Sequence, residues 1–258
     1  MRTAVVTGAS RGIGLAVAEE LEAKGWRVVS VARGRGPHAE HLAGDLSCKR
    51  TVREAAERIL DACPRIDVLV HNAGIWPAER ATNEDGLELA FATNHLAPFL
   101  LSHLLEERLA ASRARVVQVS AGIAIKGRVD LARTPTGEDF HALRTYATTK
   151  LANLMLVPLF AERWASRAIT IDAVHPGVIR TALGDRGGAS GILLRAVKRA
   201  WKAPVEGARP VVRLAIDAPA GSGRWFDGMR EVPLPEVARD RALADRVWQQ
   251  AAELCGVG

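Results

Sequence analysis

The sequence predicts an α/β fold: a single doubly wound domain over residues 1–258, with a parallel sheet and helices on both faces. Three observations lead to this prediction. Five apolar runs are followed by glycine-marked turns, stretches with helical spacing separate these runs, and no linker or internal repeat divides the chain. Continuous apolar strands that alternate with helices are typical of parallel sheets covered on both faces.

The apolar runs and the helical patterns place the elements in order. Strands are expected at residues 3–8, 26–32, 66–74, 115–122 and 169–177. Helices are expected from Ile13 to a stop near Gly25, near residues 84–111 and 141–166, and from Leu243 to Leu254. Pro158 lies inside the third helix. Because proline removes a helical hydrogen bond, we expect a kink near residues 154–158.

Composition and charge exclude several classes of protein. The net charge is +6, but no basic run or nucleic-acid motif appears, so we expect a solvated basic surface and no nucleic-acid partner. No apolar run reaches the length of a membrane span, and the first residues do not resemble a signal peptide. The three cysteines form no CxxC pair, which favours a cytoplasmic protein without disulfides or a metal site.

A glycine-rich turn, "TGASRGIG" at residues 7–14, lies between the first strand and the first helix. In a doubly wound fold this is where a dinucleotide binds. Glycines let the backbone approach a pyrophosphate, and the helix N-terminus offers free N–H groups to the anion. On this evidence alone, the stretch could also be a tight turn without a ligand.

The chain has one tyrosine, Tyr146, four residues before Lys150. Positions i and i+4 share one face of a helix, so the two side chains are expected to point the same way. A nearby ammonium favours the phenolate, so we expect the pKa of Tyr146 to lie below its usual value near 10. Tyr146 could then exchange a proton with a substrate. Taken alone, such a pair is more often a surface pair.

Taken together, these motifs resemble the short-chain dehydrogenase/reductase family over nearly the whole chain, and within it the retinol-dehydrogenase-like group. The elements that match in order are the glycine turn, "HNAG" (71–74), Asn94 in "TNHLAPF", Ser120 in "VVQVSAG", Tyr146 with Lys150, and "HPGVIRT" (175–181). His71 replaces the family's first asparagine. Thr149 replaces the serine that usually precedes the lysine.

The resemblance implies a Rossmann-type fold and a catalytic tetrad of Asn94, Ser120, Tyr146 and Lys150. In the family, the lysine also binds the nicotinamide ribose and the asparagine supports a water in a proton relay. The expected cofactor-binding residues are Gly8, Ser10, Arg11, Gly12, Ile13, Gly14, Arg33, Asp45, Leu46, Asn72, Ala73, Gly74, Tyr146, Lys150, Pro176, Gly177, Val178 and Thr181. His141 and His175 are expected to be structural.

The end of the second strand favours NADP(H) over NAD(H). It reads "SVARGRG" (30–36), and no acidic residue follows until Glu40. An acid there would bind the ribose 2′-hydroxyl and repel a 2′-phosphate, whereas Arg33 and Arg11 suit the phosphate. The resemblance assigns Asp45 to adenine. Only residues 34–44 separate it from Arg33, so we expect no helix there and an open adenine side.

We therefore expect an NADP(H)-dependent oxidoreductase that interconverts a carbonyl and an alcohol on a lipophilic small molecule. The alternative is a non-catalytic, NADP(H)-binding redox-sensing protein. The resemblance makes residues 182–203, with a basic amphipathic pattern, a lid over the substrate, although such a helix could also lie on a membrane surface. Residues 121–142 are expected to form part of the pocket wall. A homodimer and a monomer both remain open.

Overall fold

The computed structural model of the chain describes residues 1–34, 36–180, 183–184 and 201–257. Within these residues one sheet of eight strands has the order β3-β2-β1-β4-β5-β6-β7-β8. All neighbouring pairs are parallel except β7 and β8. The strands are β1 (Thr3–Thr7), β2 (Arg27–Ala32), β3 (His41–Ala43), β4 (Val68–His71), β5 (Arg115–Val119), β6 (Thr170–His175), β7 (Arg224–Asp227) and β8 (Arg230–Val232).

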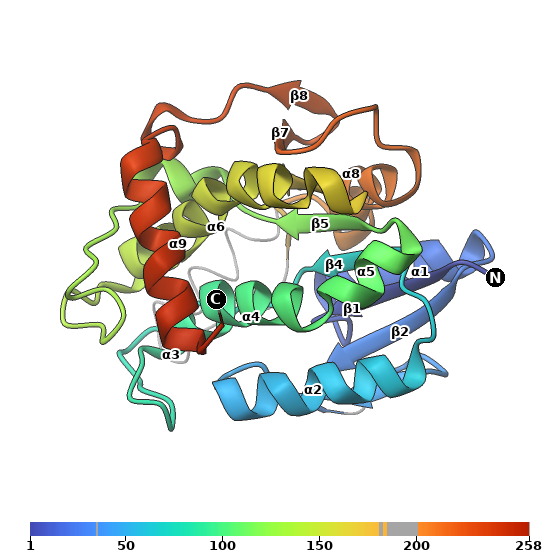
Figure 1. Cartoon of the computed structure of the whole chain (residues 1–258), viewed down its shortest axis with the longest axis horizontal. Coiled ribbons are helices and arrows are strands. Elements are labelled where there is room, and N and C mark those ends of the chain that lie inside the picture. The colour runs from blue at the N-terminus through green and yellow to red at the C-terminus, as the bar shows by residue number, and fades with distance from the viewer. Residues whose placement is uncertain (35, 181–182, 185–200, 258) are drawn as a thin grey trace.

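Helices cover both faces of this sheet, which confirms the predicted α/β fold class (Figure 1). The helices are α1 (Gly12–Ala23), α2 (Lys49–Ala62), α3 (Leu89–Phe91), α4 (Ala97–Leu104), α5 (Glu106–Ser112), α6 (Ala142–Trp164), α8 (Pro204–Asp217) and α9 (Arg241–Cys255). A π-helical turn, η1 (Ala92–Leu96), joins α3 to α4, and short 3₁₀ turns lie at Gly122–Lys126, Ala165–Arg167 and Glu236–Ala238. Among the described helices, none is long and apolar enough to cross a membrane.

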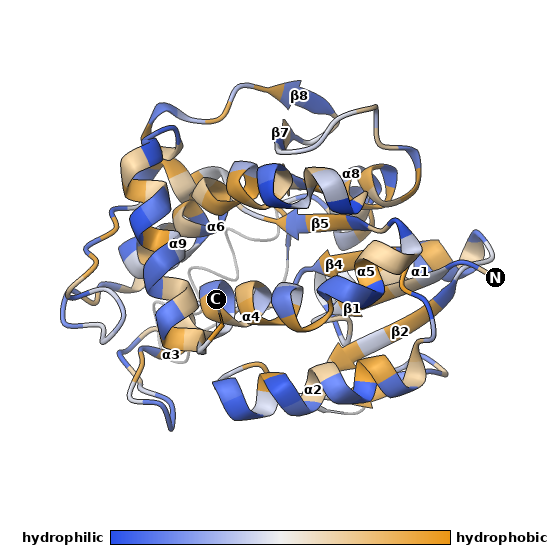
Figure 2. Cartoon of the chain, viewed as in Figure 1, coloured by the Kyte–Doolittle hydropathy of each residue, from blue (hydrophilic) through white to orange (hydrophobic). Residues whose placement is uncertain are grey.

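The apolar residues form two cores, one on each face of the sheet. Helices α1 and α8 pack on one face, whereas α2, α4 and α6 pack on the other, with α9 lying across α6. All residues of β1 and β4 are buried, as expected for central strands. Figure 2 shows mixed hydropathy on the covering helices, for example α2, whose buried positions are Val52, Ala55, Ala56 and Ile59.

Several elements escaped the sequence analysis. The spacing of the buried residues in α2 is an ordinary helical pattern that the sequence displays. In contrast, β3 and β8 have only three residues each, too few to show an alternation. Between β2 and β3 no helix lies in the described residues, as we expected from the short spacing of Arg33 and Asp45.

Helix α6 is not broken at Pro158, and the bend that we expect there stays a prediction. The helix continues without interruption from Ala142 to Trp164, with Pro158 inside it. The helix can continue past the proline because it is buried on both sides of it, at residues 145–157, Leu159 and Phe160. Proline costs the helix one hydrogen bond locally, and packing along the rest of the helix outweighs that loss.

The parallel strands share one direction, so their carboxyl ends lie at one edge of the sheet. The strand order reverses between β1 and β4, since the chain runs outward to β2 and β3 from one and to β5 and β6 from the other. Ligands of open α/β sheets bind at such a reversal, outside the carboxyl ends of the strands.

Candidate functional site

A cavity of about 850 Å³ lies at this edge. Of the residues predicted from the sequence, those that line it are Gly8, Ser10, Arg11, Gly12, Ile13, Arg33, Asp45, Leu46, Asn72, Ala73, Gly74, Ser120, Tyr146, Lys150, Pro176, Gly177 and Val178. Gly14 and Asn94 stand behind this lining. Thr181 lies outside the described residues, as do residues 182 and 185–200 of the expected lid at 182–203.

The glycine turn has a geometry that only glycine allows. Gly8 and Gly12 have left-handed backbones, with φ of +68° and +62°. A Cβ on Gly14 would lie 2.5 Å from the carbonyl oxygen of Gly8. The turn leads into α1, whose N-cap residue, Arg11, makes no side-chain capping bond. The first N–H groups of α1 thus stay available to an anion.

The loop after β4 is tied to the glycine turn by Asn72. Its Nδ2 donates to the carbonyl oxygens of Thr7, at 2.9 Å, and Gly8, at 3.2 Å. His71 instead points away from the cavity: its Nε2 lies 2.9 Å from Oγ of Ser102 on α4. Burial lowers the pKa of His71 to about 3, so the ring is neutral. The histidine that replaces the family's asparagine thus has a packing role here.

Two exposed arginine side chains lie at one end of the cavity. Arg11 and Arg33 both line this end, and both are exposed. His41 holds the turn that follows Arg33, since its Nδ1 lies 2.8 Å from Oγ of Ser30 and its Nε2 lies 2.5 Å from the carbonyl oxygen of Gly34. Two guanidinium groups, Arg33 beside this held turn and Arg11 at the N-cap of α1, favour an anionic ligand.

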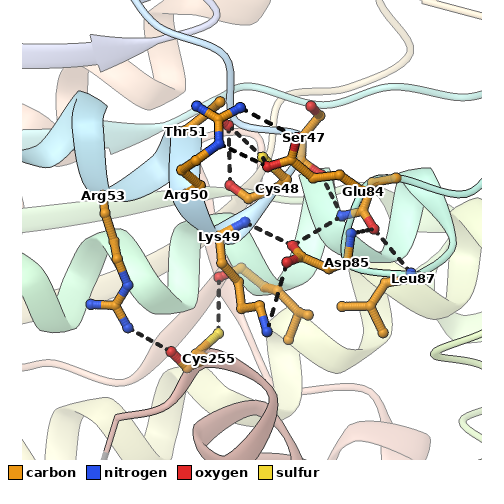
Figure 3. A network of polar contacts seen from close by, with 12 residues as sticks. Ser47, Cys48, Lys49, Arg50, Thr51, Arg53, Glu84, Asp85, Leu87 and Cys255 are labelled. Atoms are coloured by element: carbon orange, nitrogen blue, oxygen red, sulfur yellow. Dashed lines mark hydrogen bonds and ion pairs between the residues drawn. The ribbon is translucent and has the colours of Figure 1, made fainter.

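Asp45 and Ser47 line the cavity, and a polar network that includes Ser47 continues from there to the start of α2 (Figure 3). Asp45 accepts a hydrogen bond from the N–H of Ser47, at 3.0 Å. Beyond it, Asp85 accepts from the first N–H group of α2, at Lys49, with a distance of 2.9 Å. Glu84 accepts from Arg50 at 3.0 Å. The start of α2 is therefore fixed to the loop that precedes α3.

Tyr146 lies at the other end of the cavity and is 8% exposed. Its ring stacks on Trp76, with the centroids 5.4 Å apart and the planes inclined by 22°. Burial raises the pKa of Tyr146 above its usual value. Our expectation of a lowered pKa is therefore wrong for the protein by itself, because the sequence shows the nearby charge of Lys150 but not the loss of water around the phenol.

Lys150 is buried in the same wall. Its Nζ donates to the carbonyl oxygen of Val119, at 3.0 Å, and lies 5.8 Å from the centre of the Tyr146 ring. Burial lowers the pKa of Lys150 to about 8. Ser120 follows Val119 at the end of β5, and its Oγ lies 3.4 Å from the carbonyl oxygen of Lys150. The end of β5 and the middle of α6 are thereby held together.

Asn94 connects the remaining elements. Its Oδ1 accepts from the N–H of Ile75, at 2.8 Å, and its Nδ2 donates to the carbonyl oxygen of the same residue, at 2.9 Å. Nδ2 also lies 3.1 Å from Oγ1 of Thr149, which in turn donates to the carbonyl oxygen of Tyr146 at 2.8 Å. Thr149 keeps the hydroxyl of the serine that it replaces. All four tetrad candidates thus belong to one buried cluster.

Sequence reasoning missed several residues of the cavity wall. They are apolar or aromatic side chains without a motif, among them Ile75, Trp76, Leu89 and Leu143. Leu183 and Trp201 also line the cavity, and both belong to the segment 182–203 that was expected to be the lid. His175, expected to be structural, also lines the cavity, and its Nδ1 has no hydrogen-bond partner in the described part of the chain. His141 is indeed at the N-cap of α6.

The segment between Ser120 and Tyr146 only partly fulfils its expected role as a pocket wall. Residues 121–123 line the cavity, but the rest of 121–142 does not. Part of it packs instead against the loop before α3, where Arg80 donates to the carbonyl oxygen of Thr136 at 2.8 Å. The expectation was too broad because the sequence does not show which neighbour a long loop contacts.

Comparison with known proteins identifies the family. The family model for the short chain dehydrogenases matches residues 2–190. The chain belongs to the short-chain dehydrogenase family. Human retinol dehydrogenase 13 is 32% identical, over 99% of this chain and 85% of its own length. DnrU of Streptomyces sp. (strain C5), a predicted daunorubicin C-13 ketoreductase, is 35% identical, over 99% of this chain and 93% of its own length. The predicted retinol-dehydrogenase-like group is thereby confirmed.

Solved structures agree on the fold. A short-chain dehydrogenase of Burkholderia cenocepacia J2315 in complex with NADP has a TM-score of 0.68 and 25% identity, covering 88% of this chain and 95% of its own. The 3-alpha-hydroxysteroid dehydrogenase of Pseudomonas sp. B-0831, complexed with NADH, has a TM-score of 0.71 and 24% identity, with the same coverage. This short-chain dehydrogenase is thus an oxidoreductase of a family that uses nicotinamide cofactors.

Proposed function

We propose that this short-chain dehydrogenase uses NADP(H) to interconvert a carbonyl and an alcohol on a lipophilic small molecule. The observation that carries the proposal is the single cavity that joins the glycine turn to Tyr146 and Lys150. A dinucleotide laid along it would have its phosphates at the N-terminus of α1 and its far end beside the phenol. A purely redox-sensing protein would have no need of a buried proton donor there.

The residues present fit such a cofactor. The glycine cradle, which a Cβ at Gly14 would fill, allows the close backbone approach that a pyrophosphate requires. Arg11 and Arg33 would pair with a 2′-phosphate, and no described carboxylate follows β2 before Glu40 to repel it. Asp45 and Leu46 would border the adenine. A bound nicotinamide supplies or accepts the hydride.

Each polar group at the buried end has a distinct proposed role. In reduction, the Tyr146 hydroxyl donates its proton to the carbonyl oxygen, and in oxidation it takes that proton back. A pKa above the usual value keeps the phenol protonated and ready to donate. Ser120 donates a second hydrogen bond to the same oxygen and stabilises the charge that develops on it. Lys150 supplies a cation that stabilises the phenolate and holds the ribose.

The remaining cavity wall supports a lipophilic substrate. Trp76, which stacks on Tyr146, is part of this wall. Further apolar lining comes from Ile123, Leu143, Leu183 and Trp201. Apolar walls with a few convergent polar groups are typical of sites for small apolar ligands. The names of the relatives, a retinol dehydrogenase and a ketoreductase, agree with a substrate of this kind.

A panel of aldehydes and ketones tests the proposal. Each compound is mixed with the protein and NADPH, and oxidation of the nicotinamide is followed by its absorbance. We expect turnover with long-chain or polycyclic carbonyl compounds, faster with NADPH than with NADH. NADPH binding without turnover of any carbonyl, together with no oxidation of the matching alcohols by NADP, would leave the redox-sensing alternative.

A further inference from the structure

The backbone around Asn94 departs from an ordinary helix. Residues Ala92–Leu96 form a π-helical turn, with the N–H of Ala97 bonded to the carbonyl oxygen of Ala92. Such turns often occur at functional sites. Four residues after Asn94 comes Pro98, which has no N–H group. The carbonyl oxygen of Asn94 therefore cannot receive the i+4 hydrogen bond that an α-helix would provide.

A side chain from α6 supplies the missing donor. Nδ2 of Asn153 donates to the carbonyl oxygen of Asn94, at 2.7 Å. Oδ1 of Asn153 lies 2.9 Å from Nδ1 of His95. All three residues are buried. Burial lowers the pKa of His95 to about 4, so its ring is neutral and Nδ1 carries the proton that Oδ1 accepts. Both ends of the Asn153 amide are thus used.

The position of Asn153 on α6 matters as much as its contacts. Tyr146, Thr149, Lys150 and Asn153 occupy positions i, i+3, i+4 and i+7, which share one face of a helix. This face meets the π-helical turn at two points: Thr149 contacts the Asn94 side chain and Asn153 contacts its backbone. Two contacts from one rigid helix fix both where Asn94 lies and how its amide is turned.

The amide of Asn94 passes this constraint to the cavity. It is hydrogen-bonded to both the N–H and the carbonyl oxygen of Ile75. Ile75 lines the cavity next to Gly74. A Cβ on Gly74 would lie 3.4 Å from Oδ1 of Asn94 and 3.7 Å from Nζ of Lys150. A shift of Asn94 would therefore move the wall directly opposite the lysine.

We propose that Asn153 is a positioning residue of the active site: its amide replaces the donor that Pro98 lacks and holds Asn94, and through it Ile75, in register with Tyr146 and Lys150. His95 assists by fixing which end of the Asn153 amide faces Asn94. The inference rests on the proposed catalytic use of the cavity. Its structural part, the dependence of Ile75 on Asn153, can be measured without any substrate.

The test compares Asn153→Leu, which has a similar volume but no amide, with Ser102→Ala. Ser102 is a matched control because it also makes a buried hydrogen bond from α4, to His71, and touches neither Asn94 nor α6 in any bond described here. The first readout is hydrogen exchange of the Ile75 amide, which is bonded to Asn94. The second is kcat for carbonyl reduction and KM for NADPH.

We expect exchange at Ile75 to quicken by about tenfold or more in Asn153→Leu and not in Ser102→Ala. kcat should fall by about tenfold or more through misplacement of the reacting groups, while KM for NADPH changes less than about twofold. Equal exchange rates and equal kcat in the two variants would overturn the proposal.

If Asn153→Leu does not fold, the isosteric Asn153→Asp, which lacks the donor when ionised, is judged by the same criteria. A parent enzyme without turnover would refute the proposed function, and exchange at Ile75 would still decide this inference.

Discussion

The two ends of the cavity are built in different ways. At the end with Tyr146 and Lys150, the polar groups are buried, linked to one another through Asn94 and Thr149, and carry shifted pKa values. At the other end, Arg11 is exposed at the N-terminus of α1 and Arg33 is exposed on the turn after β2. Burial strengthens electrostatic interactions, whereas exposed charges are weakened by water and salt.

This difference separates the chemistry from the choice of cofactor. A buried group with fixed partners can control a proton transfer, but any change to it disturbs its neighbours. An exposed arginine can be replaced with little effect on folding, so it is a suitable residue for discriminating between NADP(H) and NAD(H). We therefore expect substitutions at the buried end to reduce rates strongly, and those at the exposed end to change cofactor preference moderately.

Tyr146→Phe should give the largest effect. It removes the proton donor but keeps the ring that stacks on Trp76. We expect kcat for carbonyl reduction to fall by about 10² or more, as is usual when a positioned proton donor is lost. No other tyrosine is present to replace it. Cofactor affinity, measured by fluorescence titration with NADPH, should change little. A Phe variant that turns over at the parental rate would exclude the proposed role.

Lys150 should make the reaction depend on pH. Its pKa is lowered to about 8, so the cationic fraction, and with it kcat/KM, should fall by about tenfold per pH unit as the pH rises above 8. Below pH 8 the lysine stays charged and this limb should be flat. The measurement is the pH profile of kcat/KM between pH 6 and pH 10.

Lys150→Arg provides the matched control for this profile. The arginine keeps its charge throughout that range, so the decline above pH 8 should disappear, although the rate at pH 7 should be lower because a guanidinium does not fit the place of an ammonium. A parental profile without any decline between pH 7.5 and pH 9.5 would contradict the requirement for a cation.

Arg33→Asp should have a moderate effect, confined to the cofactor. The carboxylate repels a 2′-phosphate and can accept from a ribose hydroxyl, so NADPH should bind about tenfold more weakly and NADH should become the preferred cofactor. Arg230→Asp is a control of equal charge change, because Arg230 lies on β8 at the opposite edge of the sheet. Equal affinities of the parent protein for NADPH and NADH would remove the basis of the prediction.

The sequence reveals this fold and site unevenly, for physical reasons. Gly8, Tyr146 and Lys150 could be placed in the cavity because their roles depend on local spacing after a strand or along a helix. Trp76 could not, since its stacking on Tyr146 joins two segments far apart in the chain. The pKa of Tyr146 was expected in the wrong direction for a related reason. Spacing shows a neighbouring charge, whereas burial depends on the whole fold.

Trp76 gives the smallest expected effect on rate and a direct test of how burial acts on Tyr146. Its Nε1 donates to the carbonyl oxygen of Ala142 at 2.9 Å, which holds the indole over the phenol at the start of α6. Trp76→Phe keeps an aromatic ring and loses this bond, so kcat should fall only by about two- to fivefold, in line with the net energy of one hydrogen bond.

Trp76→Ala should in addition admit water to the phenol. Burial is the cause of the raised pKa of Tyr146, so opening its environment should bring that pKa down toward its usual value near 10. Because Tyr146 is the only tyrosine of the chain, the phenolate absorbance after a rapid pH jump belongs to it alone. The phenolate should therefore appear at lower pH in Trp76→Ala than in the parent protein, with Trp76→Phe in between. Identical titrations in all three proteins would mean that Trp76 does not keep water from the phenol, and the cause of the burial would have to be sought in α6 and the π-helical turn.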